Sequence, residues 1–292
     1  MKKYTIIASL LLSSLTLQIA AQQRFLVAGA SSEKVAIINC ESGKVEWEYS
    51  NSEEAINKGN SVAYSKEGYV AYSTIDAAKV RNADGELIFE YRVGANEEVQ
   101  SISTTKSGYL LGICGSPIRI VELNKRGEVT KELSFESGIE NKHHQFRQIT
   151  QSKSGGYIIP LMKQSRIVEL DKKGEFVKEV KLEKSSFYVD IDSKGNWLAS
   201  SGHAGTIYSI DGKSGEVTKI IEGKELSSGA RVEFGAEVVE LRNGNILLAN
   251  WLGHNGDQSQ PILVEMDREG NVVWQMARPE GYTFASAVCP IY

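Results

Sequence analysis

The sequence predicts an all-β chain built from repeated four-stranded sheets, and three observations lead to this prediction. The 292 residues include 27 glycines, 12 tyrosines and 8 phenylalanines, a composition typical of short strands joined by tight turns. A unit of alternating apolar residues, a glycine turn and a second alternation recurs six times, with its glycine at 43, 85, 127, 174, 215 and 270. A second glycine turn separates successive copies, at 68, 108, 155, 195 and 244.

Each repeat therefore contains two hairpins and four strands. Glycine suits the positive φ that a short hairpin loop requires. In chain order, the outer hairpins span 35–47, 79–89, 118–129, 166–177, 206–217 and 262–274, and the inner hairpins turn at 65–68, 105–108, 152–155, 192–195 and 241–244. Four-stranded sheets repeated at about 45 residues are typical of β-propellers. Six copies predict a six-bladed β-propeller.

The two ends of the chain predict how the ring closes. The first repeat begins at Arg24 with its second strand and lacks an inner strand, whereas the chain ends in an unassigned apolar segment, 283–292. We expect this C-terminal strand to join the N-terminal blade, which leaves no free sheet edge. Residues 23–292 are then a single propeller domain.

Residues 1–22 have the features of a secretory signal peptide. Lys2 and Lys3 precede an apolar stretch, and Ile19-Ala20-Ala21 has the small residues of a cleavage site. The stretch is short and rich in serine, which disfavours a membrane span. We expect a periplasmic or secreted bacterial protein that is not inserted in a membrane.

Charge and cysteine content exclude several partners. Lysine and arginine total 33 against 37 acidic residues, a net charge of −4, so neither nucleic acid nor anionic lipid is expected as a partner. Cys40, Cys114 and Cys289 fall too far apart in the predicted sheets for disulfides and lack metal-ligand spacing, which predicts free thiols and no metal site. The sequence identifies no cofactor, and we expect a monomer.

Loop length distinguishes the two faces of the predicted ring. The long connections, 50–60, 136–145, 222–233 and 251–260, all emerge on one face, which we call the long-loop face. All four histidines fall there: His143, His144, His203 and His254. One interpretation is a funnel of imidazoles for catalysis or for an anion or metal; the other is that histidine, a polar residue, simply favours loops.

Polar residues at the start of the inner strands rim the predicted channel. Arg147, beside His143 and His144, is the best anion site in the sequence. Gln148 and Glu237 also lie at this mouth as candidate ligand-binding residues. The alternative is a structural ion pair between Arg147 and Glu237.

The loop of the last blade offers further candidates. Trp251, Asn255 and Asp257 on a glycine-loosened loop suit a sugar or aromatic ligand. Asn255 and Asp257 also suit the alternative role of turn residues that hold their own loop.

Two propeller families resemble parts of this sequence. Segments 240–250 and 261–274 resemble the repeat of bacterial arylsulfotransferases, and His143-His144-Gln145-Phe146 is similar to the His-His-Asp stretch of that family, with Gln145 in place of the acid. The resemblance implies a six-bladed periplasmic protein in which one histidine carries sulfate transiently. It assigns that catalytic group and its sulfuryl-binding partners to His144, His203, His254 and Arg147.

A weaker resemblance is to quinoprotein propellers. Ser42-Gly-Lys-Val-Glu-Trp47 resembles their tryptophan-docking motif, but of six equivalent positions only Trp47 and Trp274 carry the indole, so pyrroloquinoline quinone is not expected. More broadly, the chain resembles exported propellers of Bacteroidetes.

Two functions follow from these observations. The first is a non-catalytic binding protein that holds a small molecule, a glycan, a peptide or a protein on its long-loop face, since no nucleophilic triad or phosphate loop occurs. The alternative is an enzyme that uses the funnel histidines for sulfuryl transfer or for metal-assisted lyase or hydrolase chemistry.

Overall fold

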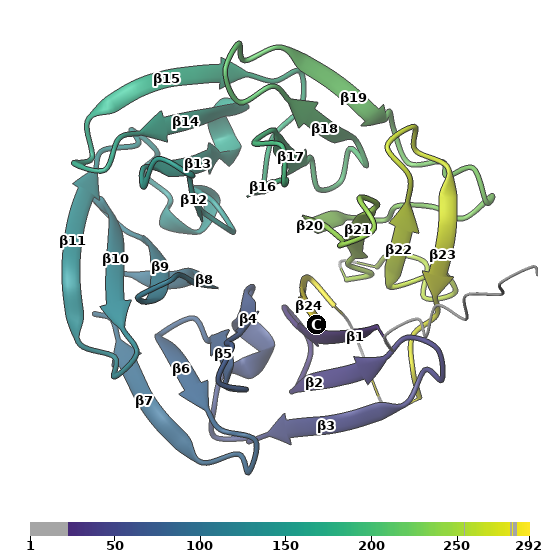
Figure 1. Cartoon of the computed structure of the whole chain (residues 1–292), viewed down its shortest axis with the longest axis horizontal. Coiled ribbons are helices and arrows are strands. Elements are labelled where there is room, and N and C mark those ends of the chain that lie inside the picture. The colour runs from purple at the N-terminus through teal and green to yellow at the C-terminus, as the bar shows by residue number, and fades with distance from the viewer. Residues whose placement is uncertain (1–22, 254, 281, 283–284) are drawn as a thin grey trace, which may run out of the picture.

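A computed structural model describes residues 23–253, 255–280, 282 and 285–292. Within these residues, 24 strands form six four-stranded antiparallel sheets arranged radially in a ring (Figure 1). The predicted six-bladed β-propeller is confirmed. The predicted signal peptide, 1–22, lies outside the described residues.

The first three blades are built from residues 24–135 together with the C-terminal strand. Blade one comprises β24 (Ala287–Ile291), β1 (Arg24–Ala28), β2 (Lys34–Asn39) and β3 (Val45–Ser50); blade two comprises β4 (Val62–Tyr64), β5 (Val70–Ser73), β6 (Ala77–Arg81) and β7 (Leu87–Arg92); blade three comprises β8 (Glu98–Thr104), β9 (Gly108–Cys114), β10 (Ile118–Asn124) and β11 (Val129–Phe135). In each blade the strands are given from the channel outward.

The remaining blades repeat this order. Blade four comprises β12 (Thr150–Gln151), β13 (Tyr157–Leu161), β14 (Arg166–Leu170) and β15 (Phe176–Lys181); blade five comprises β16 (Tyr188–Ile191), β17 (Trp197–Ser200), β18 (Ile207–Ile210) and β19 (Val217–Ile221); blade six comprises β20 (Gly235–Glu240), β21 (Ile246–Asn250), β22 (Leu263–Met266) and β23 (Val272–Met276). All eleven turn glycines found in the sequence have positive φ.

The C-terminal strand closes the ring as expected. β24 pairs antiparallel with β1, with Leu26 opposite Cys289, and forms the inner strand of blade one. Val288 of β24 also donates its backbone N–H to Glu237 of blade six at 2.7 Å. The seam between the last and first blades is therefore bonded on both sides of β24.

The core lies between the blades. The apolar residues six positions before the inner turn glycines, Val62, Ile102, Ile149, Val189 and Val238, are all buried. The three cysteines are free thiols, as predicted, and burial raises the pKa of each to about 12. Cys40 and Cys114 pack within the hydrophobic core, and Cys289 packs against it.

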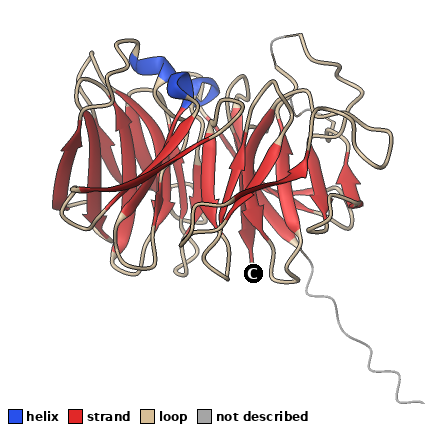
Figure 2. Ribbon diagram, turned by 90° about the horizontal axis from the view of Figure 1, so that it is seen from above, coloured by secondary structure: helices blue, strands red, loops and turns tan. Residues whose placement is uncertain are grey.

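The two faces differ in the way that the loop lengths predict. Short hairpin turns cover one face, whereas three 3-10 helices lie on the long-loop face: η1 (Ile56–Lys58), η2 (Lys142–His144) and η3 (Met162–Gln164) (Figure 2). Among the described residues, none of the helices has the length and apolar character to cross a membrane.

Candidate functional site

The long-loop face contains a cavity of about 660 Å³, which we call the funnel. Its lining comes from the starts of inner strands and from the long loops: Ala30, Ser31, Lys58, Asn60, Ile75, His143, His144, Arg147, Met162, Lys163, Ser185, Phe187, Tyr188, His203, Phe234, Trp251 and Ser286. Five of the ten site residues proposed from the sequence therefore line one cavity. They are His143, His144, Arg147, His203 and Trp251.

A short helix, η2, positions the two neighbouring histidines. The side-chain oxygen of Asn141 accepts a hydrogen bond from the backbone N–H of His143 at 3.1 Å, which caps the helical turn. The Nδ1 atom of His143 lies 2.9 Å from the carboxylate of Glu98, a residue only 7% exposed. Since Nδ1 is engaged, Nε2 is the ring nitrogen that remains for a ligand.

Glu98 is held in its charged form despite its burial. Burial alone would raise its pKa, but hydrogen bonds from His143 and Gln100 outweigh that effect and keep the pKa of Glu98 below its ordinary value. Gln100 donates to Glu98 at 2.8 Å. An ionised carboxylate that contacts Nδ1 of His143 fixes the orientation of the imidazole ring.

Arg147 presents an open guanidinium edge next to η2. Its Nη1 donates to the carbonyl oxygens of His143 at 2.6 Å and Phe146 at 3.0 Å. Within the described residues, Nε and Nη2 have no hydrogen-bond partner. A half-exposed guanidinium fixed in this way can bind a carboxylate, sulfate or phosphate through two parallel hydrogen bonds.

The rest of this side of the funnel is also basic. Lys58 of η1 and Lys163 of η3 line it, and the lining residues include no carboxylate within the described part of the chain. Burial lowers the pKa of His144, and the neighbouring positive charges of Lys163, His143 and Arg147 lower it further. We call His143, His144, Arg147, Lys58 and Lys163 the basic side.

A buried ion-pair network fixes the loop that carries Lys58. The carboxylate of Glu54 lies 2.6 Å from Arg81 and 3.3 Å from Lys79, and it accepts hydrogen bonds from Tyr49 at 2.9 Å and Tyr72 at 2.8 Å. Glu54 is four residues before Lys58. The network thus anchors the entry to η1 at the rim of the funnel.

Aromatic rings line the funnel at blades five and six. The Phe234 ring packs edge to face against Phe187, His203 and Trp251, with centroid distances of 4.9, 4.8 and 5.3 Å. The indole N–H of Trp251 donates to the carbonyl oxygen of Ala30 at 2.8 Å, so Trp251 offers the funnel its ring rather than a hydrogen bond. We call Phe187, His203, Phe234 and Trp251 the aromatic side.

Gly202 makes this packing possible. Its φ is +61°, and a Cβ at this position would lie 2.5 Å from Phe187 and 2.9 Å from Phe234. Both distances are shorter than any ordinary carbon contact. The aromatic side therefore depends on a glycine at the end of the second strand of blade five.

Two of the proposed residues lie beside the funnel rather than in its lining. Glu237 is 3% exposed and binds the N–H of Val288, and burial raises its pKa to about 8. Gln148 is 7% exposed, and its Oε1 has no hydrogen-bond partner among the described residues. The alternative of an Arg147–Glu237 ion pair is wrong, because Arg147 binds carbonyl oxygens and Glu237 bonds to β24.

The described candidates in the long loop of blade six, other than Trp251, are not among the lining residues of the funnel. Asp257 accepts hydrogen bonds from the backbone N–H of Ser259 at 2.9 Å and from the side chain of Gln260 at 2.9 Å, so it holds its own loop. Asn255 has φ +67° in the same turn. His254, the fourth proposed catalytic residue, lies outside the described residues.

Several funnel residues carry no signal in the sequence. Phe234 lines the funnel, and Glu98 contacts His143 from outside the lining. Both are brought to the site only because inner strands of neighbouring blades pack together. Phe187 does align with Arg147, since each lies eight positions before the inner turn glycine of its blade. Within the described residues, no group of three or more His, Cys, Asp or Glu side chains is arranged to hold a metal ion.

Comparison with known proteins identifies the family. The model of the family described as "Mal s 1 allergenic protein-like" matches residues 26–271, which is most of the propeller. The chain belongs to this family. It is a different family from the two whose repeats the sequence resembles, so the arylsulfotransferase and quinoprotein resemblances are limited to the blade motif. No protein with curated function matches the sequence.

Solved structures share the fold of this family member. The crystal structure of a protein of unknown function from Bacteroides caccae matches with a TM-score of 0.85 and 32% identity, over 93% of this chain and 99% of that chain. A catalytically inactive virginiamycin B lyase from Staphylococcus aureus with quinupristin matches with a TM-score of 0.56 and 15% identity, over 80% of this chain and 75% of that chain. A streptogramin B lyase matches with a TM-score of 0.57 and 13% identity, over 84% of this chain and 83% of that chain. At these identities the lyases are similar in fold alone.

Proposed function

We propose that this chain is an exported binding protein whose funnel holds an anionic ligand with an aromatic or other apolar part. One observation carries the proposal. Lys58, Arg147, Lys163 and three histidines line the funnel without a carboxylate among its described lining residues, in a chain whose net charge is −4. Such a local excess of positive charge favours an anion at this site. The leader-like residues 1–22 support export to the periplasm or the medium.

The arrangement of the two sides specifies the ligand further. An acidic group fits the free edge of Arg147, and a planar apolar group fits against Phe234 and Phe187. A volume of about 660 Å³ lies within the range of small-molecule sites. A small aromatic acid, or an acidic group at the end of a glycan or peptide, meets these requirements.

Matched ligands test the proposal. Tryptophan fluorescence or calorimetry would compare 2-naphthyl phosphate with neutral 2-naphthol, and we expect only the phosphate to bind with useful affinity. Arg147→Gln should weaken phosphate binding by roughly tenfold or more, because a charge-assisted bidentate contact is lost. Lys173→Gln, an exposed lysine on the short-turn face, is the control and should change nothing. Equal binding of naphthol and its phosphate would reject the proposal.

One observation favours the alternative, a histidine-dependent enzyme. The Glu98–His143 pair has the geometry of a carboxylate that orients a catalytic imidazole. The arylsulfotransferase resemblance assigns the sulfate carrier to His144, whereas the buried carboxylate of Glu98 contacts His143. Incubation with 4-nitrophenyl sulfate and a phenol acceptor tests sulfuryl transfer. Release of 4-nitrophenol that disappears in both His143→Gln and His144→Gln would establish the enzyme; for a binding protein we expect no release above background.

A further inference from the structure

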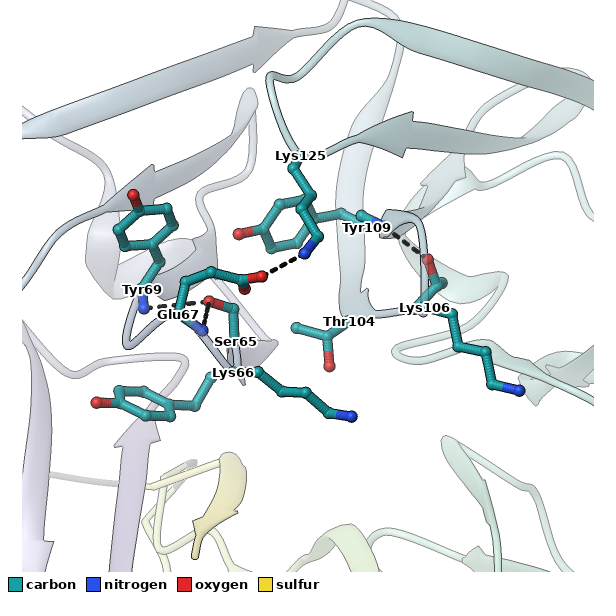
Figure 3. A pocket seen from close by; sticks show the side chains of 11 residues that line it. Ser65, Lys66, Glu67, Tyr69, Thr104, Lys106, Tyr109 and Lys125 are labelled. Carbon is teal, nitrogen blue, oxygen red and sulfur yellow. Dashed lines mark hydrogen bonds and ion pairs between the residues drawn. The ribbon is translucent and has the colours of Figure 1, made fainter.

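A second cavity lies on the face opposite the funnel, and it carries a separate inference. It has a volume of about 470 Å³ and lies between blades two and three, where their inner hairpin turns meet the outer turn that contains Lys125 (Figure 3). We call it the turn groove. We propose that the turn groove binds an acidic saccharide, one that carries uronic acid or sulfated sugars.

Two lysines in the turn groove lack partners. Lys66 and Lys106 occupy equivalent positions, directly after the first residue of the inner turns 65–68 and 105–108. Neither ammonium group makes an ion pair or hydrogen bond with the described residues, and Figure 3 draws no contact to either. Lys125, by contrast, pairs with Glu67. Two uncompensated charges from adjacent blades therefore flank one groove.

The basic character continues around the channel mouth. Five inner turns, those of blades two to six, each carry a basic residue: Lys66, Lys106, Lys153, Lys194 and Arg242. The acidic residues of these turns are Glu67, which pairs with Lys125, and the buried Asp192, which lies 3.0 Å from Arg268. This rim is positive in a chain of net negative charge, so it suits an extended ligand with repeated acidic groups.

The walls of the groove suit sugar rings. Tyr64, Tyr69 and Tyr109 line it, and the hydroxyl groups of Tyr64, Tyr69 and Thr104 have no hydrogen-bond partner within the described residues. Aromatic faces with adjacent hydroxyl groups offer both apolar contact and hydrogen bonds, which is the combination that a sugar ring requires.

Backbone bonding disfavours a peptide in the same groove. The N–H of Ser65 donates to the carbonyl of Tyr69, and the N–H of Thr105 donates to the carbonyl of Gly108, each at 2.9 Å. The turns therefore offer no free strand edge for the main-chain pairing that extended peptides use. Recognition must come from side chains. Those present are lysines, tyrosines, hydroxyls and one carboxylate, Glu67, whose charge is paired with Lys125.

Binding of trigalacturonate, with neutral maltotriose and hexaglutamate as comparison ligands, tests the inference. The measurements use the Arg147→Gln protein, so that the funnel does not contribute. We expect trigalacturonate to bind more tightly than either comparison ligand. The Lys66→Gln/Lys106→Gln double variant should weaken its binding by roughly tenfold, and added salt should weaken it too, because the contacts are exposed ion pairs.

The control is Lys172→Gln/Lys173→Gln, which removes two exposed lysines from an outer turn of blade four. It should leave the affinity within about twofold of the parent, since its charges lie outside the groove. Unchanged thermal melting of both double variants would show that they fold. The inference is overturned if trigalacturonate fails to bind, if the groove variant binds it like the control, or if hexaglutamate binds as tightly as trigalacturonate.

Discussion

His143 and His144 are adjacent in the sequence but have opposite electrostatic surroundings. His143 has the ionised Glu98 at 2.9 Å, whereas His144 is surrounded by positive charge that lowers its pKa. An imidazole in the second environment is mostly neutral near pH 7 and gains a proton when an anion arrives. In the proposed anion site the two residues therefore have different roles: His143 is oriented in advance, and His144 responds to the ligand.

This difference predicts a pH dependence of ligand affinity. An anion in the funnel raises the pKa of His144, so binding takes up a proton and strengthens as the pH falls. Between about pH 8 and pH 5.5, a single histidine gives at most roughly a tenfold gain in affinity for each unit of its pKa shift. Calorimetry with 2-naphthyl sulfate, whose own charge does not change in this range, measures the effect. His144→Gln should flatten the profile, and an affinity that rises with pH would contradict the assignment.

Glu237 predicts a pH dependence of stability. Its pKa is raised by burial from 4.5 to about 8, so the folded state holds a proton that the unfolded state releases between those values. The free energy of unfolding should therefore fall as the pH rises from about 4.5 to 8. Glu237→Gln keeps an acceptor for the N–H of Val288 and removes the titration. Its stability, measured by urea unfolding, should exceed that of the wild type at pH 8.5; a wild-type stability that rises across this window would refute the assignment.

At the scale of residues, the sequence predicted part of the funnel. His143, His144, Arg147, His203 and Trp251 line one cavity, and their common face could be predicted because they follow or precede strands at that face. The rest required the three-dimensional structure. Glu98 lies on a neighbouring blade, and only the packing of adjacent inner strands brings it to His143. Asn255 and Asp257 are polar residues suited to binding a sugar, but the carboxylate of Asp257 accepts hydrogen bonds from its own loop.

At the scale of elements, the turns could be predicted and the long loops could not. A glycine with positive φ is a local requirement, and it is visible in the sequence at the eleven inner and outer turns of the repeat. Among the 3-10 helices, η2 has a local cap in Asn141, whereas the loop that leads to η1 is held by contacts distant in sequence, the bonds of Glu54 with Lys79 and Arg81. These helices carry Lys58, His143 and Lys163, so the basic side was only partly predictable.

Gly202 supplies the sharpest test at this scale. Gly202→Ala places a Cβ against Phe187 and Phe234, whereas Gly223→Ala, at φ +84°, meets nothing within 4 Å. Both variants bear the backbone strain of a positive φ, about 1–2 kcal/mol, measurable by urea unfolding. Only Gly202→Ala should also weaken binding of 2-naphthyl phosphate. Equal affinities of the two variants for 2-naphthyl phosphate would show that the aromatic side does not contribute to ligand binding.

At the scale of the whole molecule, the ring depends on its last strand. β24 is bonded to β1 along its length and to Glu237 of blade six. Deleting residues 283–292 exposes β1 and the inter-blade core, so we expect the truncated chain to be insoluble or aggregated. Size-exclusion chromatography and circular dichroism provide the measurement. A stable, soluble, monomeric truncation would show that closure is dispensable.

The two proposed sites place different side-chain chemistry on the two faces of one scaffold. The funnel combines a basic and an aromatic side, and the turn groove combines lysines with tyrosines. The repeated hairpin explains the second arrangement, since equivalent turns bring equivalent lysines together. The first arrangement arises where the chain departs from the repeat, in the long loops.

The central claim is that the funnel binds an anion through its basic side and an apolar group through its aromatic side. The most direct measurement is a crystal structure of the protein with 2-naphthyl phosphate. The account predicts the phosphate at the free edge of the Arg147 guanidinium and the naphthalene ring against Phe234. A phosphate bound away from Arg147, or an empty funnel at saturating ligand, would contradict it.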